Sequence, residues 1–394
     1  MSMVPLRRAV CSLHGISKRC FTNVTLSETK LSNQVVTKKR STLFTEEQNR
    51  QASIITRVEK IQVHYTGVPE KCTLIMNKHL STPFDCARHI SENLCQQAVV
   101  AMVNGKVYDV HRVLTEDCEL SFKFYKDEDP YLPNKAFWRT GSVVLGYLAE
   151  RAFKDQFYVQ LHSWPQPQVR SGSFVYDVDL GIENWTPRLD ELNTLTFMGR
   201  KLINQGLHFE CIDVDASVAL RIFEDNRYKV EQIPRIAAES SSGSTVTLYR
   251  LLDHVDISCG PMVGCLNHLQ HFKVVAVHPI ETSAGLMYRF QGLAIPRDFT
   301  ISPFALDVIY ERAMRMNYTG LPRQKLDKEE DISGPHEIED KMNQRETTKA
   351  AFYARLATCK LTHPSEVFSF YVCVGVFRKM ELWREQTNMV MTGH

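Results

Sequence analysis

Residues 60–126 constrain the fold most. In this segment, short runs in which apolar and polar residues alternate surround one helix start and one tight turn. Apolar and polar residues alternate from Lys60 to Tyr65 and again from Leu120 to Phe124, as in half-buried strands. Thr82-Pro83 opens a helix, since threonine caps helices and proline is favoured at the first helical position. Asn104-Gly105 separates two apolar runs, which indicates a type I′ hairpin. The order ββαβββ predicts a small β-grasp, ubiquitin-like module.

This segment resembles the TGS domain, a module found near the start of threonyl-tRNA synthetases and in some RNA-associated GTPases. The matching residues are Thr82–Ala87 and Ala101–Asp109. The resemblance implies a docking fold rather than a catalyst. The residues agree with that implication, because so short a module carries no visible nucleophile, base or metal cluster.

The composition of the whole chain is that of a globular protein of two or three domains, with 394 residues, 43% hydrophobic and 23% charged. Its 47 Lys+Arg against 45 Asp+Glu exclude a protein that coats nucleic acid by bulk charge. Eleven cysteines without a CxxC pair favour a reducing compartment over a disulfide framework. The apolar run Val367–Phe377 is shorter than the roughly 20 residues of a membrane span.

The N-terminus has the composition of a mitochondrial transit peptide, because it is basic and has no acid before Glu28. A basic tail without targeting function is the alternative. We assign residues 1–41 to this segment and residues 42–59 to a lead-in helix. The basic residues are Arg7, Arg8, Lys18 and Arg19.

The rest of the chain predicts a second α+β domain. Pro130 and Pro133 mark a linker over residues 127–136, and helical spacing of apolar residues begins at Phe137. Strand and helix patterns around a mostly antiparallel sheet follow as far as residue 300. Residues 301–394 form a C-terminal extension, with a helix, a charged arm and a tail.

Residues 137–300 resemble the editing region that threonyl-tRNA and alanyl-tRNA synthetases share. The matching segments are Ser171–Leu180, Leu248–Arg250 and Val255–Val263. The resemblance implies a site made by a His-x-x-x-His helix and by a cysteine followed four residues later by a histidine. These side chains position the ester of mischarged tRNA and the attacking water.

The four side chains of that site are replaced in this chain. Alignment on Leu145-Gly146 and on Gly260-Pro261 gives the equivalent positions. Valine and methionine cannot take a proton or bind a metal in place of histidine, so general acid–base chemistry has no carrier. We therefore predict no catalytic residues and no editing activity. The degenerate positions are Arg139, Val143, Ser258 and Met262.

Other chemistries have little support. Cys259 stands one residue from the family's cysteine, and a shift by one residue on a strand points a side chain to the opposite face. Five histidines and cysteines fall within residues 254–271, but their spacing is no recognised zinc pattern, and we expect no metal. The last hundred or so residues lack a class II aminoacylation core, and the chain has no P-loop or Gly-x-Gly-x-x-Gly, so we expect no cofactor. The five residues are His254, Cys259, Cys265, His268 and His271.

A basic N-terminus, a TGS domain and an editing-like region without a catalytic core resemble a family of mitochondrial large ribosomal subunit proteins. The resemblance implies a structural constituent in the mitochondrial matrix, held by rRNA and neighbouring ribosomal proteins, with no small-molecule substrate. Arg139 and Arg170 are candidates for contact with RNA phosphate, although a solvated or salt-bridged arginine is the commoner case. The charged arm Gln324–Lys349 and the aromatic tail are candidates for burial against partners.

Two other functions stay open at this stage. The chain could be a free-standing deacylase of mischarged tRNA that uses Cys259 or a nearby histidine. It could also be an RNA-binding regulator outside the ribosome.

Overall fold

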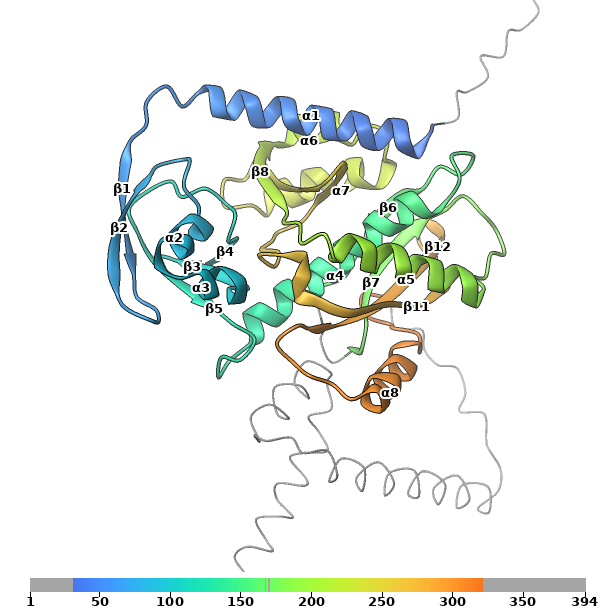
Figure 1. Ribbon diagram of the computed structural model, residues 1–394. Helices are drawn as coiled ribbons and strands as arrows, with labels where there is room; N and C mark the ends of the chain where they lie inside the picture. The colour runs from blue at the N-terminus through green and yellow to red at the C-terminus, as the bar shows by residue number, and fades with distance from the viewer. Residues whose placement is uncertain (1–30, 167, 169–170, 322–394) are drawn as a thin grey trace, which may run out of the picture.

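The structure, a computed structural model, describes residues 31–166, 168 and 171–321 (Figure 1). These residues form an N-terminal module and a larger second module, and the predicted α+β class is confirmed. The predicted transit peptide up to residue 30, the charged arm and the aromatic tail lie outside the described residues. In the described part, no helix is both long and apolar enough to cross a membrane.

The N-terminal module is the predicted β-grasp. Its sheet has the strand order β2-β1-β5-β3-β4, in which β1 pairs antiparallel with β2 and parallel with β5. Asn104 and Gly105 both take positive φ, 49° and 74°, as the predicted type I′ turn requires. The strands are β1 (Lys60–Tyr65), β2 (Cys72–Asn77), β3 (Val100–Val103), β4 (Lys106–Tyr108) and β5 (Cys118–Lys123).

The helix of this module is capped as predicted but is broken in two. The Thr82 hydroxyl accepts from the Asp85 backbone N–H at 3.2 Å, and the Asp85 carboxylate accepts from the Thr82 N–H at 3.0 Å. Extended backbone at Ser91 ends α2 (Pro83–Ile90) and begins α3 (Glu92–Gln97). Apolar residues at helical spacing from Phe84 to Leu94 had predicted one continuous helix, and that prediction was wrong.

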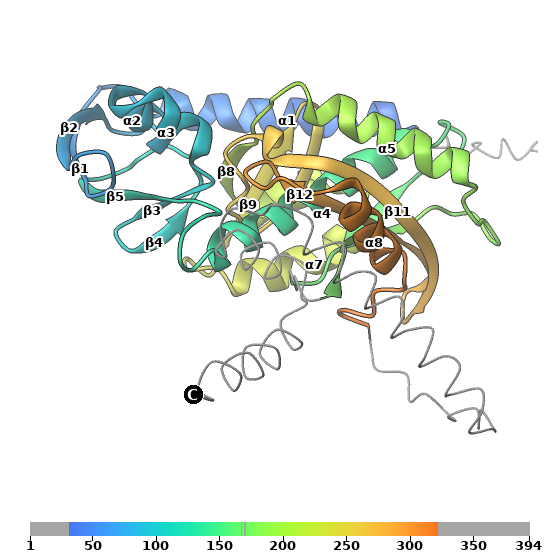
Figure 2. The ribbon, with the colours of Figure 1, turned by 60° about the horizontal axis from the view of Figure 1, so that its bottom comes forward.

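The second module contains two antiparallel sheets, where one was predicted. The larger has the order β11-β12-β7-β6, and the smaller has the order β10-β9-β8. The long hairpin of β11 and β12 forms a curved wall, which Figure 2 shows beside α5 and α8. The strands are β6 (Gln160–Ser163), β7 (Phe174–Asp179), β8 (Glu210–Asp215), β9 (Thr245–Leu251), β10 (His254–Ile257), β11 (Leu269–Thr282) and β12 (Gly285–Pro296).

Helix α4 is the central element of this module. Gly141 and Gly146 face the larger sheet, where an added Cβ would lie 2.7 Å from the Phe174 ring and 2.8 Å from the Tyr176 ring. These two glycines therefore let the helix backbone lie directly on β7. The helices of the module are α4 (Tyr131–Ala152), α5 (Leu189–Ile203), α6 (Ala216–Ile222), α7 (Arg227–Ala238) and α8 (Pro303–Ala313).

Two predicted boundaries are wrong, and one helix was not predicted. Helix α4 begins at Tyr131, inside the predicted linker, because a proline in the first turn removes no helical hydrogen bond. Helix α1 (Asn33–Ser53) begins nine residues before Thr42 and includes part of the basic segment assigned to residues 1–41. Helix α7, which has Pro234 in its interior, was not predicted.

The N-terminal module has a hydrophobic core of its own, and the two modules also meet in a shared core. Val99, Val100 and Tyr125 of the N-terminal module belong to the same buried cluster as α4 and the larger sheet. Helix α1 lies along one edge of the molecule, close to α6 (Figure 1). Its Phe44 is fully buried among residues of the smaller sheet and of α6 and α7.

Candidate functional site

The turn after β10 depends on a glycine in the left-handed conformation. Strand β10 ends at Ile257, and Gly260 takes a positive φ of 54°. The Ser258 hydroxyl is buried and accepts from the Gly260 backbone N–H at 3.2 Å. Cys259 next to it is exposed. The turn therefore points Ser258, at the position where the resemblance implies a cysteine, inward, and it points Cys259 outward.

Helix α4 meets this turn, so the structure brings together the two elements that carry the degenerate positions. The Arg139 guanidinium donates to the Pro261 carbonyl at 2.8 Å. The Thr140 hydroxyl donates to Ala136 O at 2.8 Å and accepts from the Val263 backbone N–H at 3.0 Å. These hydrogen bonds fasten the turn to α4.

The side chains at this junction offer no acid–base chemistry. Val143 and Met262 are 1% and 2% exposed and belong to one hydrophobic cluster. The Thr140 hydroxyl lies 3.7 Å from the Met262 sulfur. Of the four positions, only Ser258 carries a hydroxyl, and this hydroxyl accepts from the Gly260 backbone N–H within the turn itself. Apolar side chains thus occupy two of the three positions at which the resemblance implies histidine, and Arg139 occupies the third.

A carboxylate from the N-terminal module enters the same place. Asp109, just after β4, accepts from the Met262 backbone N–H at 2.8 Å and from the Tyr249 hydroxyl at 2.6 Å. Burial raises the pKa of Asp109, although these two hydrogen bonds act in the opposite direction. An added Cβ on Gly260 would lie 1.8 Å from the Tyr249 oxygen and 3.3 Å from Asp109 Oδ2. The chain itself therefore fills the space beside the turn.

Asp256, on β10 just before the turn, belongs to a buried ion pair. Its carboxylate accepts from the Lys229 ammonium at 2.6 Å and from the Tyr176 hydroxyl at 2.7 Å. Burial is the largest single influence and would raise the pKa of Asp256, but the neighbouring positive charges, Lys229 first, and the hydrogen bonds from Lys229 and Tyr176 together outweigh it, so the pKa is lowered. This pair connects α7, β10 and β7.

A second buried ion network holds α1. The Arg40 guanidinium donates to Glu150 of α4 at 3.0 Å and to Asp225, between α6 and α7, at 2.5 Å. His254 Nδ1 lies 2.6 Å from the other Glu150 oxygen. Sequence reasoning missed Asp109, Arg40 and their partners, because these contacts join residues more than a hundred positions apart.

The structure describes one of the two arginines that were candidates for contact with RNA phosphate. Arg139 is 5% exposed, and its hydrogen bond to Pro261 lies inside the protein, so the structure does not favour contact with phosphate. Arg170 lies outside the described residues. Across residues 31–321, gaps excepted, no three His, Cys, Asp or Glu side chains are grouped as metal ligands.

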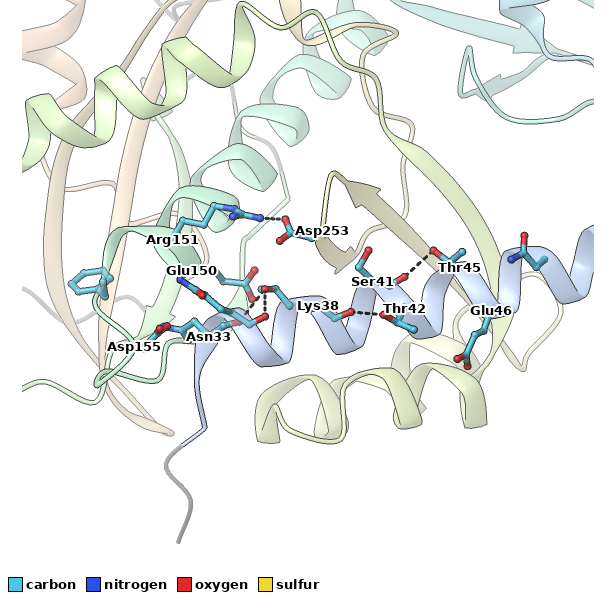
Figure 3. Close-up of a pocket in the computed structure, with 14 residues that line it drawn as sticks. Asn33, Lys38, Ser41, Thr42, Thr45, Glu46, Glu150, Arg151, Asp155 and Asp253 are labelled. Atoms are coloured by element: carbon cyan, nitrogen blue, oxygen red, sulfur yellow. Dashed lines mark hydrogen bonds and ion pairs between the residues drawn. The ribbon is translucent and has the colours of Figure 1, made fainter. Parts of the chain in front are cut away.

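A separate groove lies between α1 and the end of α4, on the side of the turn between β9 and β10 (Figure 3). Its volume is about 630 Å³. Polar side chains of α1 line one wall, and Arg151, Phe153, Asp155 and Asp253 line the other. We call it the α1 groove. The degenerate positions do not line it.

Comparisons with known proteins agree with both modules. The TGS domain family matches residues 72–123. The chain is 41% identical over 297 residues to "Large ribosomal subunit protein mL39" of Drosophila melanogaster, covering 75% of this chain and 89% of that protein. It is 30% identical over 198 residues to "Probable threonine--tRNA ligase 1, cytoplasmic" of Dictyostelium discoideum and over 209 residues to "Threonine--tRNA ligase, mitochondrial" of Rattus norvegicus. These matches cover 26% of each ligase.

Proposed function

Because the chain belongs to the mL39 family of large ribosomal subunit proteins, we propose that it is a structural constituent of the mitochondrial large ribosomal subunit. One observation carries the proposal: the similarity extends over 89% of the Drosophila protein but over only a quarter of each ligase. The chain therefore corresponds to almost the whole of a ribosomal protein and to one part of an enzyme.

In this role the protein supports mitochondrial translation in the matrix by docking to rRNA and to neighbouring ribosomal proteins. Its net charge of +2 supports a position among proteins as well as RNA, since a protein bound to RNA alone generally presents a stronger basic field. The shared core of the two modules supports a rigid docking shape. We propose the outer surface, rather than the former pocket, as the functional part.

We also propose that the protein has no tRNA-editing or aminoacylation activity. The filled space at Val143 and Met262 supports this, because neither side chain can move a proton. The inward contacts of Arg139 and Asp109 support it further, since both side chains are engaged with the backbone of the turn itself.

Sedimentation tests the ribosomal role. Mitochondrial lysate containing the epitope-tagged full chain is separated on a sucrose gradient after a high-salt wash. We expect the protein to travel with the large subunit. A protein that stays at the top of the gradient would contradict the proposal and favour a regulator outside the ribosome.

A deacylation assay tests the alternative of an enzyme, which the ligase similarity and the exposed Cys259 favour. Purified protein is incubated with seryl-tRNA specific for threonine, and release of serine is followed against buffer alone. We expect no acceleration. Multiple turnovers that disappear in Cys259→Ala would overturn the proposed loss of activity.

A further inference from the structure

Two threonine hydroxyls of α1 serve the α1 groove only as hydrogen-bond acceptors. The hydroxyls of Thr37 and Thr42 donate to the carbonyls of Asn33 and Lys38, each at 2.9 Å, and Figure 3 shows the bond of Thr42. A hydroxyl has one hydrogen and two lone pairs, so each of these hydroxyls has only acceptor capacity left for a ligand. These two hydroxyls therefore favour a ligand that supplies N–H groups.

The Thr45 hydroxyl continues the same pattern. It donates to the Ser41 carbonyl at 3.0 Å, and its oxygen accepts from the Arg250 guanidinium at 2.5 Å. Thr45 is thus an example of a threonine hydroxyl of α1 that accepts a hydrogen bond from a cation. The hydroxyls of Thr37 and Thr42 can accept a hydrogen bond from a ligand in the same way.

The charges of the groove have the same preference. Besides Glu150, whose two oxygens contact Arg40 and His254, its lining carries the carboxylates of Glu46, Asp155 and Asp253. Two cations line it, Lys38 and Arg151, and Arg151 is paired with Asp253. Glu46 and Asp155 are exposed, and neither forms an ion pair with another residue of the described part of the chain. Within that part, the two unpaired carboxylates of the groove outnumber its one unpaired cation, Lys38.

We propose that the α1 groove binds a lysine- and arginine-rich segment of a neighbouring protein, and not the phosphates of RNA. Phosphate oxygens are acceptors with negative charge, so the threonine oxygens and the carboxylates would both repel them. Ammonium and guanidinium groups are donors with positive charge and fit both features. The neighbour is assigned to the ribosome on the strength of the proposed function, whereas the ligand chemistry follows from the groove alone.

Fluorescence anisotropy of the purified full chain tests the groove with a labelled peptide of alternating lysine and serine. The test variant is Glu46→Lys/Asp155→Lys. The matched control is Glu183→Lys/Glu281→Lys, which makes the same charge change at exposed residues away from the groove. Circular dichroism first shows that both variants keep the wild-type fold.

We expect the test variant to bind the peptide about tenfold more weakly and the control to stay within about twofold of wild type. An oligouridylate of equal length should not displace the peptide. The proposal is overturned if the wild-type chain does not bind the peptide, if both variants weaken equally, or if the RNA competes. None of these results depends on sedimentation with the ribosome. The proposal for the groove and the proposal for the ribosomal role can therefore be refuted independently of each other.

Discussion

Replacing Arg40 with methionine tests whether the buried ion network stabilises the fold through α1. The side chains of Arg40, Glu150 and Asp225 are 2%, 4% and 5% exposed. Methionine keeps most of the apolar length of arginine but leaves two buried carboxylates without their cation. Breaking a buried ion pair by removal of one partner costs about 3–5 kcal/mol, because the remaining charge is uncompensated.

Lys39 provides the matched control on the same helix. It pairs with Glu224 at 2.5 Å, but the two side chains are 40% and 59% exposed. Exposed pairs contribute about 0–1 kcal/mol, so Lys39→Met should change the stability little. Arg40→Lys should give an intermediate loss, since a single ammonium does not reproduce the planar fork that reaches both carboxylates.

Urea unfolding followed by tryptophan fluorescence measures these differences. If the slope is about 2–3 kcal/mol per molar urea, the Arg40→Met midpoint falls by about 1–2 M. A loss below about 1 kcal/mol for Arg40→Met would refute the argument. An equal loss in Lys39→Met would refute it too, because the effect would then come from α1 rather than from its buried charge.

Three further predictions use the same unfolding assay. Gly260→Ala should lose about 3 kcal/mol or more, since a left-handed φ and a clash with Tyr249 each cost roughly 1–3 kcal/mol. Gly243→Ala, left-handed but in open space, should lose only about 1–2 kcal/mol, and equal losses would contradict the clash. Tyr249→Phe should lose about 1.5–3 kcal/mol through the hydrogen bond to Asp109, and an unchanged midpoint would argue against that contact. Burial lowers the pKa of His268 from 6.5 to about 3, so the unfolded chain binds the proton first and stability falls below pH 6.5. Between pH 7 and pH 5 this lowers the free energy of unfolding by about 2 kcal/mol, and His268→Phe should remove that part of the fall.

The N-terminal module could be predicted because its signals are local. The Thr82 cap, the Asn104-Gly105 turn and the alternation from Lys60 to Tyr65 each act within a few residues, and the structure contains all three. The break at Ser91 was missed, because apolar spacing continues across it. Periodicity reports a buried face and does not report whether the backbone is continuous.

The second module shows what sequence patterns cannot supply. Its central helix and strands follow from periodicity, but Pro133 suggested a linker, whereas it lies in α4, and α7, which contains Pro234, was not predicted. The division into two sheets depends on which strands pair, and pairing is a property of the whole fold.

The candidate site also has features that the sequence predicts and features that it does not. The two elements that carry the degenerate positions were predicted from spacing, and the structure brings them together through Arg139 and Pro261. The contact of Asp109 with the turn could not be predicted, since its partners Tyr249 and Met262 lie 140 and 153 residues away in the sequence. Nor could the burial of Arg40, because a basic residue in a basic segment usually faces solvent.

The distant partners of α1 also set the order in which the chain can fold. A polypeptide emerges with its N-terminus first, so α1 is the earliest of the described elements to be made. Its Arg40 meets Glu150 and Asp225 only after 110 and 185 further residues, and an isolated helix of this length is marginal in water. We therefore expect α1 to wait during synthesis and to close over a body that has already formed, so that the first helix made is among the last to dock.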